Sequence, residues 1–441
     1  MGVATVRHER EGSERLAHAL RIVRAPRQFV RPWYLAYLLL GIVTSGILPV
    51  LLPLTVATRS HELSTVAYVL GAYNFGLLTS PAWGILAERI KAYRTLFLGS
   101  FLLTAAGILG LLLLRQLSWW LASAFALGAG AGGAATLATF FIVDFSARAE
   151  WEARIGWLQC FNATGQVAGL MLAAAFSAGN SAVALWLCVA VLLLAMAVGG
   201  IGLPPSKARP ATGADKHLHL HLNLRLLAIF PRLNVASDVV HHSYHLLLPG
   251  LRALPRVAGT PFARFLLSWF VLAFAVAGFF SYFPLMLSQS YGIGTRATAL
   301  LYAAISALAT ALYILAGHLS DRYGARRIYS SGLALRMVGF ALLLAPFLVP
   351  VKGRSLFAAV GFSLIVVAWP LLSVAGTDLA ARLTPFSEGA AVGLLNAALA
   401  LATAAGIVLS GPLVAHLGYA TIPATALAGL AVSLLLAIGR R

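Results

Sequence analysis

The chain has 441 residues, of which 60% are hydrophobic and only 10% are charged, whereas soluble domains usually carry about 25% charged residues. The mean hydropathy of +0.88 excludes an ordinary soluble protein, because so apolar a chain needs lipid as the solvent for much of its surface. The formal net charge of +19 comes from basic residues between apolar runs rather than on one folded face, so no nucleic-acid partner is expected.

The apolar runs are long enough to cross a lipid bilayer, since a transmembrane helix needs about twenty apolar residues. In chain order we predict helices at 34–57, 65–87, 95–114, 117–143, 155–177, 181–203, 265–289, 297–316, 327–350, 354–376, 388–411 and 415–438. The expected domains are a cytoplasmic tail (1–33), a six-helix bundle (34–203), a central cytoplasmic loop (204–264) and a second six-helix bundle (265–441). The sequence thus predicts an all-α membrane protein with twelve transmembrane helices.

The loops differ in positive charge, and this difference predicts the orientation of the helices. Most of the 32 Lys and Arg residues fall in the tail, in the central loop and in the short loops on the same side. The opposite side holds only Arg59, Arg115, Arg296, Lys352 and Arg354. Basic loops stay in the cytoplasm, so both termini are expected there, in a plasma membrane.

Matching motifs recur in the two halves. Gly84-Ile-Leu-Ala-Glu88-Arg89 follows the second predicted helix, and Gly317-His-Leu-Ser-Asp321-Arg322 follows the eighth. Asp144 and Arg148 end the fourth helix as Asp378 and Arg382 end the tenth. The halves are therefore repeats, and they are parallel because each begins on the same side. Parallel repeats suit a transporter whose halves rock around a central site.

The stretch Gly317-His-Leu-Ser-Asp321-Arg322-Tyr-Gly324-Ala-Arg326-Arg327 resembles a signature of the major facilitator superfamily, Gly-x-x-x-Asp-Arg-x-Gly-x-Arg-Arg. The stretch from Gly84 to Arg94 resembles the first-half copy, with Glu88 in place of the Asp and Lys91 where a Gly is common. The resemblance implies a secondary carrier, monomeric and without a cofactor, that moves a small-molecule substrate across the bilayer.

In this family the motif acid faces a helix N-terminus of the opposite half and a nearby Arg, and thereby locks the inner gate. A carboxylate gains about 0.3–1 kcal/mol at a helix N-terminus. The expected gate residues are Gly84, Glu88, Arg89, Arg94, Asp144, Arg148, Gly317, Asp321, Arg322, Gly324, Arg326, Arg327, Asp378 and Arg382. The alternative is that these charges only set the topology.

Polar residues within the predicted helices are candidates for substrate binding, because they are costly in lipid. Gln159, Asn162 and Gln166 lie at i, i+3 and i+7, on one helix face. The other candidates are Asn74, Tyr282, Tyr302, Trp369 and Asn396. Each could instead form hydrogen bonds between helices. A cavity with aromatic side chains and few amides favours an amphiphilic or hydrophobic solute.

The 13 acidic residues all fall in loops, tails or helix ends. Proton-coupled carriers commonly use a buried carboxylate, so the coupling ion stays open. Arg336 is the clear charge within a span. It follows Arg327 by about 13 Å of helix, so we expect its side chain to extend to the inner interface. An interior salt bridge or an anionic substrate are the alternatives.

No metal site or enzymatic activity is expected. The histidines of the central loop lack a Cys or acid cluster, and Cys160 and Cys188 form no disulfide framework. The sequence carries no nucleotide-binding or hydrolase motif in a suitable context. The expected function is export of small, fairly apolar organic compounds. The alternatives are uptake of a polar nutrient, or a sensor or lipid-handling scaffold that does not transport.

Overall fold

The computed structural model describes residues 30–90, 92–146, 151–176, 181–203, 260–385 and 388–438, and all regular elements within these ranges are helices. Most of the predicted tail and of the central loop, including its histidines, lies outside the described residues. The first half contains α3 (Tyr34–Gly41), the π-helix η1 (Ile42–Ile47), α4 (Leu48–Ser60), α5 (Leu63–Leu77), α6 (Ser80–Ile90), α7 (Tyr93–Leu113), α8 (Leu117–Phe145), α9 (Trp151–Ala175) and α10 (Ser181–Gly202). The second half contains α12 (Pro261–Tyr291), α13 (Thr295–Tyr323), α14 (Ala325–Leu348), α15 (Arg354–Leu383), α16 (Glu388–Leu417) and α17 (Thr421–Ile438).

Each of the twelve predicted segments corresponds to one helix or to consecutive helices. Among the described residues, nine helices are long and apolar enough to cross a membrane. The first of them, Tyr34–Ser60, joins α3, η1 and α4. The second predicted segment is divided into α5 and α6 by a turn, in which the hydroxyls of Thr79 and Ser80 donate to the carbonyls of Gly76 and Leu77. Helix α9 is not among these nine, because its polar side chains lower its mean hydropathy.

The last turn between helices lies further along the chain than predicted. The boundary was expected between residues 411 and 415, but α16 continues through Pro412 to Leu417. The turn comes at Gly418, whose φ is +79°. Glycine adopts this left-handed conformation without the steric cost that a Cβ would impose, and it therefore ends the helix where the proline does not.

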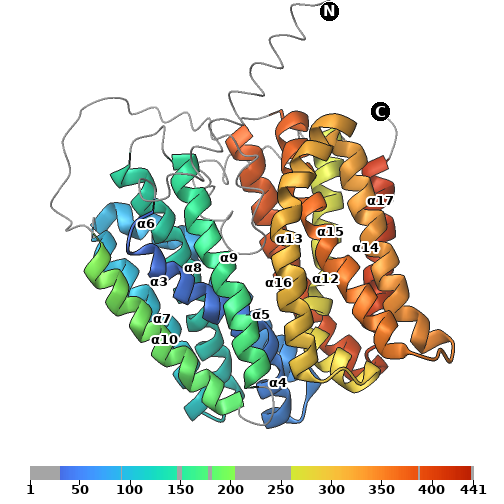
Figure 1. The fold of residues 1–441 in the computed structure, drawn as a ribbon, viewed down its shortest axis with the longest axis horizontal. Coiled ribbons are helices and arrows are strands. Elements are labelled where there is room, and N and C mark those ends of the chain that lie inside the picture. The colour runs from blue at the N-terminus through green and yellow to red at the C-terminus, as the bar shows by residue number, and fades with distance from the viewer. Residues whose placement is uncertain are drawn as a thin grey trace, which may run out of the picture.

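Two groups of helices lie side by side, α3–α10 on one side and α12–α17 on the other (Figure 1). The same pairs pack within each group: α7 on α8 and α14 on α15, η1 on α9 and α12 on α16, and α5 on α8 and α13 on α15. This correspondence confirms the prediction of two repeats in one fold.

Glycines allow matching helices of the two halves to approach closely. A Cβ added to Gly169 of α9 would lie 2.1 Å from the carbonyl oxygen of Ile42 in η1. A Cβ added to Gly406 of α16 would lie 2.3 Å from the carbonyl oxygen of Phe274 in α12. Because lipid gives helices no hydrophobic reason to associate, such close backbone packing is a main source of their attraction.

Candidate substrate site and gates

The first half presents a polar pair at a distortion of its first long helix. In η1 the amide of Leu48 donates to the carbonyl of Val43, five residues back instead of four. A π-turn of this kind often marks a functional site. The hydroxyl of Ser45 in η1 lies 3.5 Å from Oδ1 of Asn162 in α9, at the limit of a hydrogen bond. Both residues are half-buried.

The amide stripe of α9 divides in the structure. Asn162 and Gln166 are half-buried, whereas Gln159 is 5% exposed. Asn74 of α5 donates its side-chain amide to the carbonyl of Leu70 on its own helix, at 2.8 Å. Asn396 is half-buried on α16. The sequence reasoning missed Ser45, although Thr44-Ser45-Gly46 is a polar cluster within the first predicted span.

Aromatic rings and one guanidinium form the corresponding part of the second half. Arg336 of α14 is 2% exposed, and its Nε donates to the carbonyl of Ile365 in α15 at 3.2 Å. Its Cζ lies 5.3 Å from the ring centre of Trp369 and 5.8 Å from that of Phe280. Both rings are half-buried. Phe280 was another residue that the sequence reasoning missed.

The prediction that Arg336 extends to the membrane interface is wrong. Ala334 and Val338, two residues before and after it, are exposed on the outside of α14. Residues two apart point to nearly opposite sides of a helix, so Arg336 points into the second half. There its guanidinium lies beside Phe280 of α12 and beside Trp369 and the Ile365 carbonyl of α15.

Tyr302 and Tyr282 are buried in this conformation. Tyr302 packs edge-on against Phe283 and Phe362, with ring centres 5.4 Å away in both cases. The hydroxyl of Tyr282, in the last third of α12, donates to the carbonyl of Leu63 at 2.5 Å. Leu63 begins α5, so this hydrogen bond joins the two halves.

Further contacts between the halves lie near the Tyr282 bond, at the end of the bundle where α4 ends and α5 begins. We call this the closed end. A Cβ added to Gly71 of α5 would lie 2.7 Å from Cγ2 of Val408 in α16, and one added to Gly411 would lie 2.5 Å from Cβ of Ala67. Helix α4 also packs on α12, and α9 packs on α13. Backbone-level contact leaves no room for a solute between α5 and α16 here.

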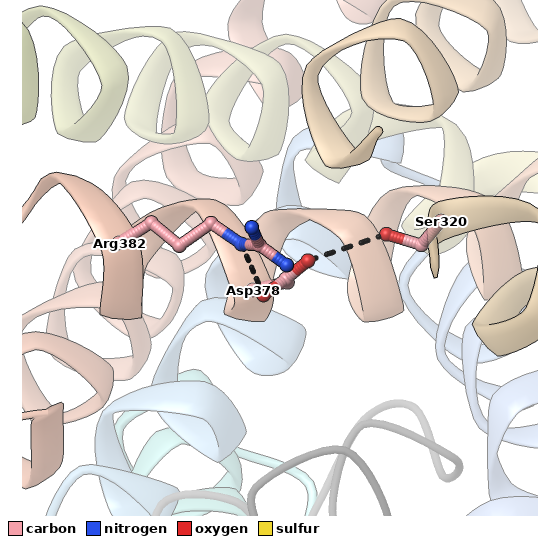
Figure 2. A network of polar contacts seen from close by, with 3 residues as sticks. All are labelled: Ser320, Asp378 and Arg382. Carbon is pink, nitrogen blue, oxygen red and sulfur yellow. Dashed lines mark hydrogen bonds and ion pairs between the residues drawn. The ribbon is translucent and has the colours of Figure 1, made fainter. Parts of the chain in front are cut away.

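At the opposite end of α15, Asp378 joins two elements. Its Oδ1 accepts a hydrogen bond from Nε of Arg382 at 2.8 Å, and its Oδ2 accepts one from the hydroxyl of Ser320 in α13 at 3.4 Å (Figure 2). Ser320 directly precedes the motif residue Asp321. The Arg382 side chain is 58% exposed, so the ion pair itself contributes little, about 0.3–0.5 kcal/mol for such a helical pair.

Two predicted gate arginines make equivalent contacts inside their own halves. Arg94, which begins α7, donates to the carbonyl of Gly200 near the end of α10. Arg326, which begins α14, donates through Nε to the carbonyl of Ala437 near the end of α17, at 2.9 Å. The carbonyls at a helix C-terminus lack partners within the helix and attract cations. Arg94 therefore joins α7 to α10, and Arg326 joins α14 to α17.

The remaining predicted gate residues vary in their surroundings. Gly324 has φ +87° and separates α13 from α14, and Gly84 packs against the ring of Phe140. Arg322 and Arg327 are exposed, while a Cβ added to Gly317 would meet no atom within 4 Å. The side chains of Glu88, Arg89, Asp144 and Asp321, and the whole of Arg148, lie outside the described residues.

A metal site does not emerge from the described part of the chain, where no three His, Cys, Asp or Glu residues are grouped. Cys160 and Cys188 are both free thiols.

Comparison with known proteins agrees with this architecture. The family model of the Major Facilitator Superfamily matches residues 33–383 and 265–440. The fold is similar to that of a mutant of the nucleoside transporter NupG (TM-score 0.69, 11% identity, 92% of this chain and 97% of that one). It is also similar to a D-xylose–proton symporter (0.66, 17%, 92% and 95%) and an auto-inhibited peptide transporter of the POT family (0.66, 16%, 94% and 98%).

At 11–17% identity these structural similarities establish the fold alone. They do not indicate the substrate of this protein. No curated protein matches the sequence. The family model spans most of the chain, including both halves. The protein is therefore a multi-pass, non-enzymatic secondary transporter that belongs to the Major Facilitator Superfamily.

Proposed function

We propose that this transporter exports small amphiphilic organic compounds across the plasma membrane, as a monomer that alternates between inward-facing and outward-facing states. The observation that carries the proposal is the character of the half-buried side chains at mid-span. The second half offers the rings of Trp369 and Phe280, and the first half offers Ser45 and Asn162. Sites that bind small molecules are mostly apolar with a few polar groups that fix orientation.

The charge distribution supports an assignment of inside and outside. With the basic loops in the cytoplasm, the closed end faces the exterior. The conformation described is then inward-facing, with a substrate site that opens to the cytoplasm, the side from which an exporter loads. The cytoplasmic gate would form around Asp378 and the two motif acids, Glu88 and Asp321, when the halves close at that side.

Uptake of a polar nutrient is the second candidate. The half-buried amides of Asn162, Gln166 and Asn396 favour it, because sites for hydroxylated substrates are built from hydrogen-bonding groups. A sensor or lipid-handling scaffold of the same fold would need no gate at all. The matched gate motifs of the two halves argue against that reading.

Reconstitution into liposomes tests the direction and the substrate class together. We expect amphiphilic aromatic compounds to cross proteoliposomes faster than protein-free liposomes, and sugars or nucleosides of similar size not to do so. In everted membrane vesicles, which expose the cytoplasmic side, the same compounds should accumulate in the lumen. Flux of the sugars or nucleosides alone would contradict export of amphiphiles and favour uptake of a polar nutrient. Flux of neither set of compounds would favour the non-transporting scaffold.

A further inference from the structure

Arg336 places a permanent positive charge at mid-depth in the second half. It stands near the centre of α14, a helix of 24 residues, and is 2% exposed. A guanidinium stays charged in proteins, and an ionisable residue inside a membrane is by default a functional-site hypothesis. The inner-gate motif does not include Arg336, which lies about 15 Å along the helix from Arg326.

The surroundings hold the charge in place and put two half-buried aromatic rings beside it. The hydrogen bond from Nε to the Ile365 carbonyl fixes one edge of the guanidinium. Trp369 and Phe280 present ring faces to it from α15 and α12, and both rings are half-buried. Helix α12 also contacts α4 and α5 of the opposite half. Phe280 thus joins the guanidinium to a helix that borders the opposite half.

A charge in a medium of low dielectric acts over a longer range than it does in water, because little solvent screens it. A solute with an apolar body could stack on Trp369 and Phe280 while an anionic group on it is attracted by Arg336. A cationic solute at the same place would be repelled. Arginine also binds carboxylate, sulfonate and phosphate groups through two parallel N–H donors.

From this placement we infer that Arg336 is a specificity-determining residue and that the transported compounds are amphiphilic organic anions. The rings of Trp369 and Phe280 bind the apolar body, and the guanidinium selects the negative group. This inference rests on the proposed function and narrows its substrate class. It also fits a chain whose acidic residues avoid the middle of the spans, because no fixed negative charge there would oppose an anion.

The test compares three probes with one apolar body and different charge: naphthoate, its neutral amide and naphthylmethylammonium. Binding to the purified full-length protein in detergent is measured by calorimetry for the wild type and for Arg336→Gln, Arg336→Lys and Trp369→Phe. We expect the wild type to bind naphthoate at least about tenfold more tightly than the amide, which is about 1.4 kcal/mol. Arg336→Gln should remove that preference and leave the affinity for the amide within about twofold.

The other two variants separate charge from fold. Arg336→Lys keeps the charge and should keep the sign of the preference, even though the hydrogen bond to Ile365 is altered. Trp369→Phe should weaken the binding of all three probes and preserve the order of their affinities. If the Arg336→Gln protein elutes as an aggregate, Arg336→Lys becomes the deciding variant. Loss of the anion preference in a well-folded Arg336→Lys protein would overturn the inference.

The outcomes distinguish this inference from the proposed function. Equal binding of the three probes to the wild type, or tighter binding of the cation, overturns the role of Arg336 while export of amphiphiles stands. An anion preference that persists unchanged in Arg336→Gln also overturns it. Absence of flux for a wider panel of amphiphiles, charged and neutral, contradicts the proposed function itself.

Discussion

The hydrogen bond between Tyr282 and Leu63 should bias the transporter toward the state that is closed at the Leu63 end. It is 2.5 Å long, and it joins α12 to α5 across the two halves. The bond must break when the halves separate there, so its net free energy counts only in the closed state. Replacing Tyr282 with Phe keeps the ring and removes the hydroxyl. A hydrogen bond contributes about 0.5–1.5 kcal/mol net, so the ratio of open to closed protein should rise about two- to thirteenfold.

The populations can be measured with pairs of spin labels on the two halves at that end. Arg115→Cys and Lys352→Cys provide exposed sites in loops of the first and second half, after Cys160→Ala removes the exposed native thiol. Double electron–electron resonance then gives the distribution of distances between the labels. In the Tyr282→Phe protein the ratio of the long-distance to the short-distance population should increase by the factor given above.

Tyr291→Phe is the matched control. Tyr291 lies on the same helix, and its hydroxyl donates to the carbonyl of Leu343 in α14, a bond of the same kind that stays within the second half. Its loss should lower thermal stability and leave the distance distribution unchanged. An unchanged distribution in Tyr282→Phe, or an equal shift in both variants, would refute the reasoning that the Tyr282 bond is specific to one state.

Three further predictions concern packing and the gate. Gly406→Val should destabilise the protein by about 1–3 kcal/mol, because its Cβ would overlap the Phe274 carbonyl. Thermal unfolding in detergent measures this loss. The control is Gly99→Ala, which should change the unfolding temperature little because a Cβ there meets nothing within 4 Å. Arg94→Ala and Arg326→Ala should each lower the unfolding temperature by similar amounts, since each removes one bond to the last helix of its half; a loss in only one of them would contradict their equivalence. Asp321→Asn should slow transport and increase labelling of cytoplasmic-side cysteines, and unchanged transport with unchanged labelling would show that the motif acid only sets topology.

Much of the fold could be predicted because the membrane imposes a simple constraint. Runs of about twenty apolar residues identified the segments that became helices, and the repeated Gly-x-x-x-acid-Arg motifs identified the repeats and the family. Individual helices were harder to predict. The division of the second segment at Thr79 and the π-turn at Ser45 depend on local hydrogen bonds, which a hydropathy average does not contain.

The candidate site could be predicted only in part, because helix direction and inter-half contacts decide what a residue faces. The helical spacing of Gln159, Asn162 and Gln166 predicted one shared face, but it could not show that Gln159 is buried while the other two are half-buried. Tyr282 was a reasonable cavity residue by position, yet its hydroxyl binds the opposite half. The Arg336 side chain was expected to reach the membrane–water interface. The sequence does not reveal that α14 exposes the side of Ala334 and Val338 and buries the side of Arg336.

Export of amphiphilic organic compounds by alternating access requires the closed end to open in every cycle. This requirement can be tested by the flux of a fluorescent amphiphile into everted vesicles, compared between the wild type and a double variant, Gly71→Cys with Val408→Cys, which can be crosslinked at the closed end. We expect accumulation in wild-type vesicles, loss of accumulation in the crosslinked variant, and recovery after reduction. Undiminished accumulation in the fully crosslinked protein would show that transport does not depend on opening at this end.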